Sequence, residues 1–196
     1  MMRPLLILCL LLLLVGCSTP PSRFYVLTPV APDASPKPTT SPGIGVVVGP
    51  VSLPEYLLRP QIALRNEANE IQFQEFHRWA EPLHGNFSRV LAENLSRLLH
   101  SARVVRYPGY RAGDLPYQVV VDVTRLDVGK GRPVTLVARW RILDRHDRKP
   151  LYDGRSTIQE PVEGNAPQAI VAAQSRALAQ LSREIAEALE RHEKSP

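Results

Sequence analysis

The chain has 196 residues, a formal net charge of +5 and two cysteines, Cys9 and Cys17. Both cysteines lie close to the N-terminus, so the rest of the chain offers no disulfide, no cysteine ligand for zinc and no thiol nucleophile. The modest charge is spread along the chain, and no basic motif with interleaved aromatic residues is present, which argues against nucleic-acid binding.

The N-terminal segment has the pattern of an export signal. Arg3 is followed by an unbroken apolar run, Leu5 to Val15, and then by Gly16 and Cys17. A membrane span needs about 20 apolar residues, whereas a basic start, a short apolar run and a small residue before the cleavage site are typical of a secretory signal. The segment resembles a bacterial lipoprotein signal, which implies removal of residues 1–16 and acylation of Cys17, with palmitate among the acyl chains. In an ordinary secretory signal, the alternative, Cys17 would be incidental.

Residues 17–42 are interpreted as an acylated cysteine followed by a proline-rich tether. Prolines at positions 20, 21, 29, 32, 36, 38 and 42 disfavour a helix or a packed core. At about 3.1 Å per residue, such a segment would hold a domain several nanometres from a bilayer. Residues 23–27 are aromatic and β-branched, which predicts a short strand. We expect this strand to join an edge of the domain's own sheet; the alternative is that a partner receives it.

Hydrophobic periodicity predicts one domain over residues 43–192. The predicted strands cover residues 44–51, 61–64, 70–74, 103–107, 117–126, 134–143 and 151–159. The predicted helices cover residues 83–100 and 167–191. The last three strands alternate apolar and polar residues and form an antiparallel meander. The order of elements predicts an α/β layered domain, with a mixed sheet and two main helices packed against it.

No catalytic or metal-binding constellation is found in the sequence. The five histidines are not spaced as a helical metal pair, and no cluster of carboxylates accompanies them. There is no nucleophile elbow and no phosphate-binding loop. We therefore expect no enzymatic activity, no metal and no cofactor.

Two groups of residues are candidates for contact with a partner. Arg78 and Trp79 stand in the most distinctive internal segment, and these residue types are enriched at interface hot spots. The alternative for Trp79 is a core aromatic that locks a strand-to-helix turn. Arg139 and Arg141 belong to the densest basic group of the chain. That group would contact anionic headgroups or an acidic partner, and the alternative is a solvated strand end and turn.

Several segments carry a resemblance to a known family. They are the lipobox with Cys17 and residues 23–27, 49–57, 59–62, 75–83 and 89–95. The most specific parts are the Leu-Pro-Glu-Tyr segment at 53–56 and the Arg-Trp-Ala-Glu-Pro run at 78–82. In this order, which covers nearly the whole mature chain, the segments resemble the PqiC-type (YmbA-like) family of ABC/MCE transport auxiliary lipoproteins.

The resemblance implies an auxiliary component of an MCE-type (mammalian cell entry) system that transports phospholipid between membranes. The lipoprotein would be held in the outer membrane and face the periplasm, and Ser18 after Cys17 fits that sorting by the enterobacterial rule. Its implied partners are a periplasmic MCE-domain protein (PqiB-like) and inner-membrane transport components, with homo-oligomerisation left open. The implied fold is a three-layer α/β domain with a largely antiparallel mixed sheet, similar to the N-terminal domain of TolB.

The family offers no catalytic residues to carry over, so Cys17 is the one position that the resemblance assigns. Two other functions stay open at this point. A regulator of a cell-wall synthase would have a similar anchor and tether. A lipid-binding carrier would need an apolar cavity inside the domain, and the regular alternation of the strands gives no sign of one.

Overall fold

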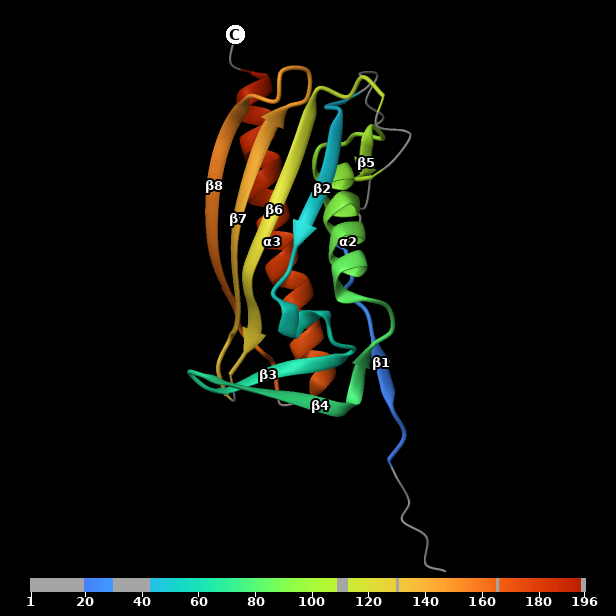
Figure 1. The fold of residues 1–196 in the computed structure, drawn as a ribbon, viewed down its shortest axis with the longest axis vertical. Helices are drawn as coiled ribbons and strands as arrows, with labels where there is room; N and C mark the ends of the chain where they lie inside the picture. The colour runs from blue at the N-terminus through green and yellow to red at the C-terminus, as the bar shows by residue number, and fades with distance from the viewer. Residues whose placement is uncertain (1–19, 30–42, 109–112, 130, 165, 195–196) are drawn as a thin grey trace, which may run out of the picture.

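The structure is a computed structural model, and it describes residues 20–29, 43–108, 113–129, 131–164 and 166–194. The predicted signal segment and Cys17 lie outside these residues. Within them, the chain forms a five-stranded sheet, a three-stranded sheet, two long helices and one short 3-10 helix (Figure 1). None of the described helices combines the length and the apolar character that a membrane crossing requires.

The five-stranded sheet has the order β5-β2-β6-β7-β8. Its strands are β2 (Val46–Ser52), β5 (Val104–Arg106), β6 (Tyr117–Val128), β7 (Val134–Asp144) and β8 (Pro150–Glu160). Strand β2 runs parallel to both of its neighbours, while β6, β7 and β8 form the predicted antiparallel meander. The β-branched run at the start of β2 is buried, as expected for a strand with neighbours on both edges.

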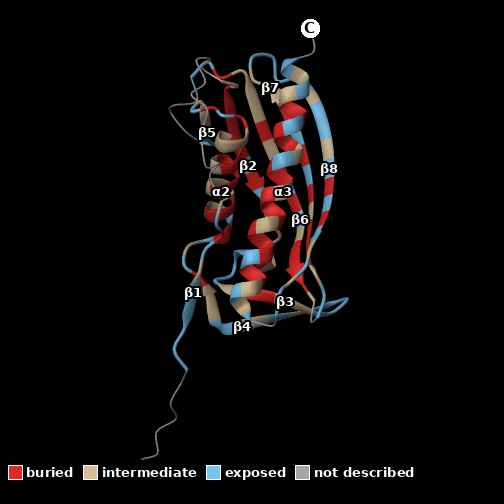
Figure 2. Ribbon diagram, turned by 180° about the vertical axis from the view of Figure 1, so that it is seen from behind, coloured by how far each residue is buried: buried red, intermediate tan, exposed pale blue. Residues whose placement is uncertain are grey.

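Both long helices lie on the same face of this sheet (Figure 2). Helix α2 (Leu83–Leu98) packs on β2 and β5, and α3 (Pro167–Glu193) packs on β7 and β8. The two helices also contact each other, and there the buried Asn94 amide donates a hydrogen bond of 3.0 Å to the Ser182 hydroxyl. Small residues such as Ala173 and Ala177 are fully buried in α3 and let its backbone approach its neighbours closely.

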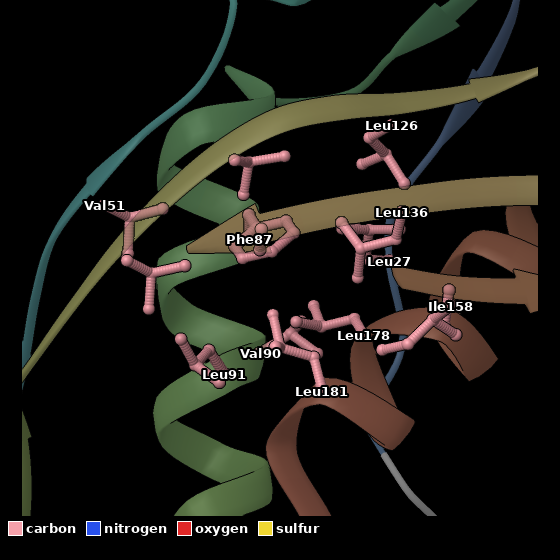
Figure 3. Packing of buried hydrophobic residues seen from close by; sticks show 14 of the residues in the cluster. Leu27, Val51, Phe87, Val90, Leu91, Leu126, Leu136, Ile158, Leu178 and Leu181 are labelled. Atoms are coloured by element: carbon pink, nitrogen blue, oxygen red, sulfur yellow. The ribbon is translucent and has the colours of Figure 1, made fainter. Parts of the chain in front are cut away.

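The core lies between the sheet and the two helices, and the predicted tether contributes to it. Figure 3 shows Leu27 beside Phe87 of α2, Leu136 of β7 and Leu178 of α3. Leu27 is 1% exposed, and its backbone N–H donates a hydrogen bond of 2.6 Å to the Asn86 side-chain oxygen. A residue that the sequence places in a linker is therefore part of the hydrophobic core.

A second, three-stranded sheet with the order β1-β4-β3 lies across one end of the molecule (Figure 1). Its strands are β1 (Arg23–Tyr25), β3 (Gln61–Glu67) and β4 (Glu70–Trp79), and the 3-10 helix η1 (Glu55–Leu58) precedes β3. Strands β3 and β4 form the predicted hairpin, and β1 pairs with β4 in parallel. The expectation that the early strand joins the domain's own sheet is confirmed.

The α/β class, the mixed pairing and the two main helices agree with the sequence prediction. The structure divides the strands between two sheets. The main sheet and the two helices make two layers, and the small sheet closes one end of them (Figures 1 and 2). The open face of the main sheet remains exposed because its side chains are largely polar, for example Asp122, Thr124 and Arg139.

The expected long spacer is shorter than predicted. Strand β1 and Leu27 fix residues 23–27 on the domain, so only residues 18–22 separate Cys17 from the first strand. Residues 30–42 connect this attached segment to β2 and lie outside the described residues. The reach from Cys17 to the folded domain is therefore five residues and not the whole proline-rich segment.

Candidate functional site

The predicted contact residues Arg139 and Arg141 lie on β7 and face solvent from the open side of the main sheet. Arg141 forms an ion pair of 2.5 Å with Asp153, and both side chains are more than half exposed. Exposed pairs of this kind contribute about 0.2–1 kcal/mol to stability. Arg141 is thus available to a partner at little cost to the fold.

Arg139 has a different environment, because its cross-strand neighbours carry opposite signs. The strand register places Asp122 opposite Arg139 on one side and Arg155 on the other. The Asp122 carboxylate also accepts a hydrogen bond of 2.5 Å from the Ser52 hydroxyl. Two like charges directly opposite each other destabilise a sheet, and neither arginine forms an ion pair with another described residue.

These residues define one surface, which we call the open face: Asp122, Thr124, Arg139, Arg141, Asp153, Arg155 and Thr157. The face is polar, and no helix among the described residues covers it, since both long helices lie on the opposite side (Figure 2). Its three arginines outnumber its two aspartates, which makes the face suitable for an acidic partner. The sequence identified Arg139 and Arg141, but it could not show that Arg155 stands next to them.

The second predicted pair, Arg78 and Trp79, lies at the end of β4, in the other sheet from Arg139 and Arg141. Trp79 is 5% exposed and belongs to the core, which agrees with the alternative of a core aromatic and corrects the assignment of Trp79 as a contact residue. Tyr25 of β1 pairs with Trp79, and the Ala80 N–H donates a hydrogen bond of 2.9 Å to the Tyr25 carbonyl, so β1 covers this end of β4. Arg78 keeps part of its guanidinium in solvent and donates a hydrogen bond of 2.8 Å to the Glu75 carbonyl.

A buried carboxylate that sequence reasoning missed joins the two sheets. The Asp127 side chain is fully buried near the end of β6. Arg65 of β3 contacts one of its oxygens at 2.8 and 2.9 Å, and Arg125 donates to the other oxygen at 2.9 Å. The Tyr56 hydroxyl of η1 lies 3.3 Å away and donates to the same carboxylate.

The surroundings of Asp127 shift the protonation equilibria of its neighbours. Burial raises the pKa of the Tyr56 hydroxyl, and the nearby Asp127 carboxylate raises it further. The hydrogen bond to Asp127 raises the pKa of the Arg65 guanidinium. Both groups are therefore held in the protonated form that can donate to Asp127. The donors come from η1, β3 and β6 and meet at one buried carboxylate, so this cluster links the two sheets.

A cleft of about 980 Å³ opens between the β3–β4 hairpin and the β6–β7 turn. Leu64, Val128 and Ile170 supply apolar walls, and Gln72 and Arg132 supply polar groups. None of the predicted contact residues lines it. Residues 130 and 165, which adjoin the lining residues in sequence, lie outside the described residues, so we assign no ligand to the cleft.

Histidine, cysteine and carboxylate side chains do not gather into a metal-binding group of three or more anywhere in the described ranges. The histidine nearest to a predicted contact residue is His77, whose Nδ1 lies 2.8 Å from the Tyr25 hydroxyl. That hydrogen bond links β1 to β4 and gives His77 a role in holding the tether strand.

Comparison with known proteins identifies the family. A family model described as the ABC-type transport auxiliary lipoprotein component matches residues 25–186. The chain belongs to this family. It is the PqiC-type (YmbA-like) family whose motifs appear in the sequence, and the matched range begins inside β1. Tyr25 is the last residue of β1, so Arg23 and Phe24 lie outside the matched range.

Solved structures similar to this auxiliary lipoprotein show the same fold. A Xanthomonas campestris protein of the DUF330 family is 18% identical, with a TM-score of 0.70, and the alignment covers 89% of this chain and 100% of that one. An uncharacterized protein is 17% identical, with a TM-score of 0.69, and the alignment covers 86% of this chain and 98% of that one. A search of curated proteins gives no match. At these identities the likeness concerns the fold alone.

Membership in the family makes the chain a lipoprotein auxiliary to ABC-type transport. For such a protein the relevant sites are the anchor and the surfaces that meet other components. The open face and the end that carries β1 are the two surfaces of this domain with distinctive side chains.

Proposed function

We propose that this auxiliary lipoprotein is held in the outer membrane by acylated Cys17 and docks the periplasmic tube of an MCE-type system that transports phospholipid. The family match over residues 25–186 carries the proposal, because it describes an auxiliary lipoprotein of ABC-type transport. The lipobox supports an anchor at Cys17, and Ser18 supports sorting to the outer membrane by the enterobacterial rule.

The open face is the surface that we assign to the MCE-domain partner. It exposes Arg139, Arg141 and Arg155, and the register places the first and last of these directly opposite each other. Acidic groups of a partner would relieve the repulsion between these two arginines and would gain two hydrogen-bond donors that are already exposed. Complementary charge of this kind sets the speed and specificity of docking more than its final affinity.

The first test is affinity purification of the full-length acylated protein from crosslinked membranes, with mass spectrometry of the recovered proteins. Recovery of an MCE-domain protein together with inner-membrane transport components is the expected result. Recovery of a cell-wall synthase without any MCE-domain protein would contradict the proposal and favour the regulator hypothesis.

A charge-reversal pair tests the assigned surface. Arg139→Glu places a carboxylate beside Asp122 on the open face, so we expect it to reduce the amount of MCE-domain protein recovered. Arg183→Glu is the matched control, because Arg183 is an exposed arginine on α3, in the opposite layer. Equal losses for both variants, or none for either, would show that the open face is not the docking surface.

A further inference from the structure

Four large apolar side chains are exposed at the end of the molecule that carries the small sheet. They are Phe24, Val26, Leu58 and Phe76, which are 63%, 41%, 48% and 37% exposed. The small sheet brings their segments together, because Phe24 pairs with Arg78 and the Trp79 N–H donates to the Pro60 carbonyl at 2.7 Å. We call these four residues the end patch.

The outward direction of the patch on β1 follows from the strand alternation. Tyr25 packs against the core, and its hydroxyl reaches the His77 ring at 2.8 Å. Neighbouring residues of a strand point to opposite sides, so Phe24 and Val26 point away from the core. The pairing of β1 with β4 therefore leaves the Phe24 and Val26 side chains exposed.

Basic residues accompany the apolar ones. Arg23 and Arg59 are exposed. The Arg78 side chain is 38% exposed, and its guanidinium lies 3.7 Å from the Glu75 carboxylate. The Arg59 guanidinium also lies 4.7 Å from the centre of the Phe73 ring. Long basic side chains beside aromatic ones are suited to the boundary between lipid headgroups and acyl chains, where the apolar parts are buried and the charges meet phosphate.

The length of chain between the anchor and the first strand places this end close to the membrane. Cys17 and Arg23 are six residues apart in the sequence. A fully extended chain spans about 3.4 Å per residue, so this connection cannot exceed about 20 Å. The opposite end of the domain, where α3 ends, lies far from β1 along the long axis of the molecule (Figure 1).

From these observations we propose that the end patch rests on the surface of a phospholipid bilayer, with Phe24 and Phe76 among the headgroups. The inference depends on the proposed function through the acylation of Cys17, and it adds an orientation. The domain stands on its small sheet with its long axis directed away from the membrane, and its open face is turned to the side, where a partner can reach it.

The test uses the absence of other cysteines in the mature chain. An environment-sensitive fluorophore is attached at Phe24→Cys, Phe76→Cys or Tyr107→Cys in the full-length acylated protein. Tyr107 is the matched control because it is 54% exposed and follows β5, away from the small sheet. The labelled proteins are reconstituted into vesicles of phosphatidylethanolamine and phosphatidylglycerol, with and without brominated lipids.

We expect brominated lipids to quench the labels at positions 24 and 76 and to leave the label at 107 unquenched. Equal quenching at all three positions, or none at any, would overturn the inference. Mass spectrometry showing unmodified Cys17 would overturn it as well. If the labels at 24 and 76 are shielded only when an MCE-domain protein is added, the end patch is a protein-docking surface instead, and the inference is wrong.

The outcome is separate from the test of the proposed function, which depends on the identity of recovered partners. Loss of the MCE partner with intact lipid quenching would refute the function and keep the orientation. Recovery of the MCE partner without lipid quenching would refute the orientation and keep the proposed function. Since Phe24 and Phe76 are exposed, we expect both variants to keep the circular dichroism spectrum and melting temperature of the parent protein.

Discussion

Replacing Asp127 by asparagine should weaken the link between the two sheets. The substitution keeps the size of the side chain and removes its charge. Arg65 and Arg125 then lose a carboxylate that they contact at 2.8 to 2.9 Å, and one oxygen acceptor is replaced by an amide N–H group that faces their donors. Because Asp127 is fully buried, water cannot replace the lost acceptor at its position.

The size of the effect follows from the exposure of the two arginines. Removing one partner of a buried ion pair costs about 3–5 kcal/mol. The Arg65 and Arg125 side chains are 23% and 40% exposed, so water can solvate part of each freed charge. We therefore expect a loss of about 2–3 kcal/mol in the free energy of unfolding. For a domain of this size that corresponds to a decrease in melting temperature of about 5–10 °C.

The assay is urea unfolding followed by circular dichroism, with Asp153→Asn as the control. Asp153 also pairs with an arginine, but both side chains of that pair are more than half exposed, so its loss should cost less than about 1 kcal/mol. Hydrogen exchange should show faster opening of β3 in Asp127→Asn, because Arg65 belongs to that strand. If Asp127→Asn destabilises no more than Asp153→Asn, the link between the sheets does not depend on the buried charge.

Three further changes test other parts of the structure. Gly154→Ala should destabilise the fold by about 1–3 kcal/mol, because its Cβ would lie 2.3 Å from the Trp140 ring; urea unfolding measures this. Asn86→Ala should cost about 1–3 kcal/mol by leaving the buried Leu27 N–H without its acceptor, and it should speed hydrogen exchange at that amide. Burial raises the pKa of Tyr117 from 10.0 to about 12. In a titration followed by absorbance, the difference between the wild type and Tyr117→Phe is the Tyr117 phenolate, which should form near pH 12.

The raised pKa of Tyr117 also makes the stability of the fold depend on pH. Between pH 10 and 12 the unfolded chain loses the Tyr117 proton and the folded chain keeps it, so stability falls as the pH rises through this range. The slope of stability with pH should therefore be shallower in Tyr117→Phe. Titration of the Tyr117 hydroxyl near pH 10 would contradict the effect of its partial burial and of its hydrogen bond to Glu193. A wild-type melting temperature in Gly154→Ala would mean that Trp140 can move aside.

The sequence predicted the elements of the main sheet and both helices well, because their periodicity is local. Alternation along β6 and β7 marks one face as apolar without knowledge of the partner strands. The prediction of strand β4 stopped at Gln74, whereas the strand continues to Trp79. Its last part is held by Arg23 to Tyr25, more than fifty residues earlier in the chain, and no local pattern reports such a pairing.

The sequence also could not show the surroundings of Asp127 and Arg155, because these depend on contacts between segments far apart in the chain. A register shift between Val123 and Arg125 reverses the alternation near the end of β6, so Leu126 points into the core and Asp127 to the other side. From the sequence, an aspartate at this position indicates a strand end in solvent. Its burial depends on Arg65 in the other sheet, a contact across 62 residues. The pairing of Arg139 with Arg155 likewise depends on the strand register.

The attachment of β1 also determines how the domain responds to force. A pull on Cys17 loads the three residue pairs between β1 and β4 first, together with the hydrogen bond from Leu27 to Asn86. The neighbouring strands β6 and β7, by comparison, share eleven paired positions. Under tension β1 would peel away while the main sheet stays folded.

Release of β1 would lengthen the connection between Cys17, the proposed anchor, and the domain. The 29 residue steps from Cys17 to Val46 could then extend to about 100 Å, against about 20 Å with β1 in place. The pairing of β1 with β4 thus sets which of these two lengths separates Cys17 from the main sheet. The domain could follow a displaced partner over this distance and return to its short connection when the tension ends.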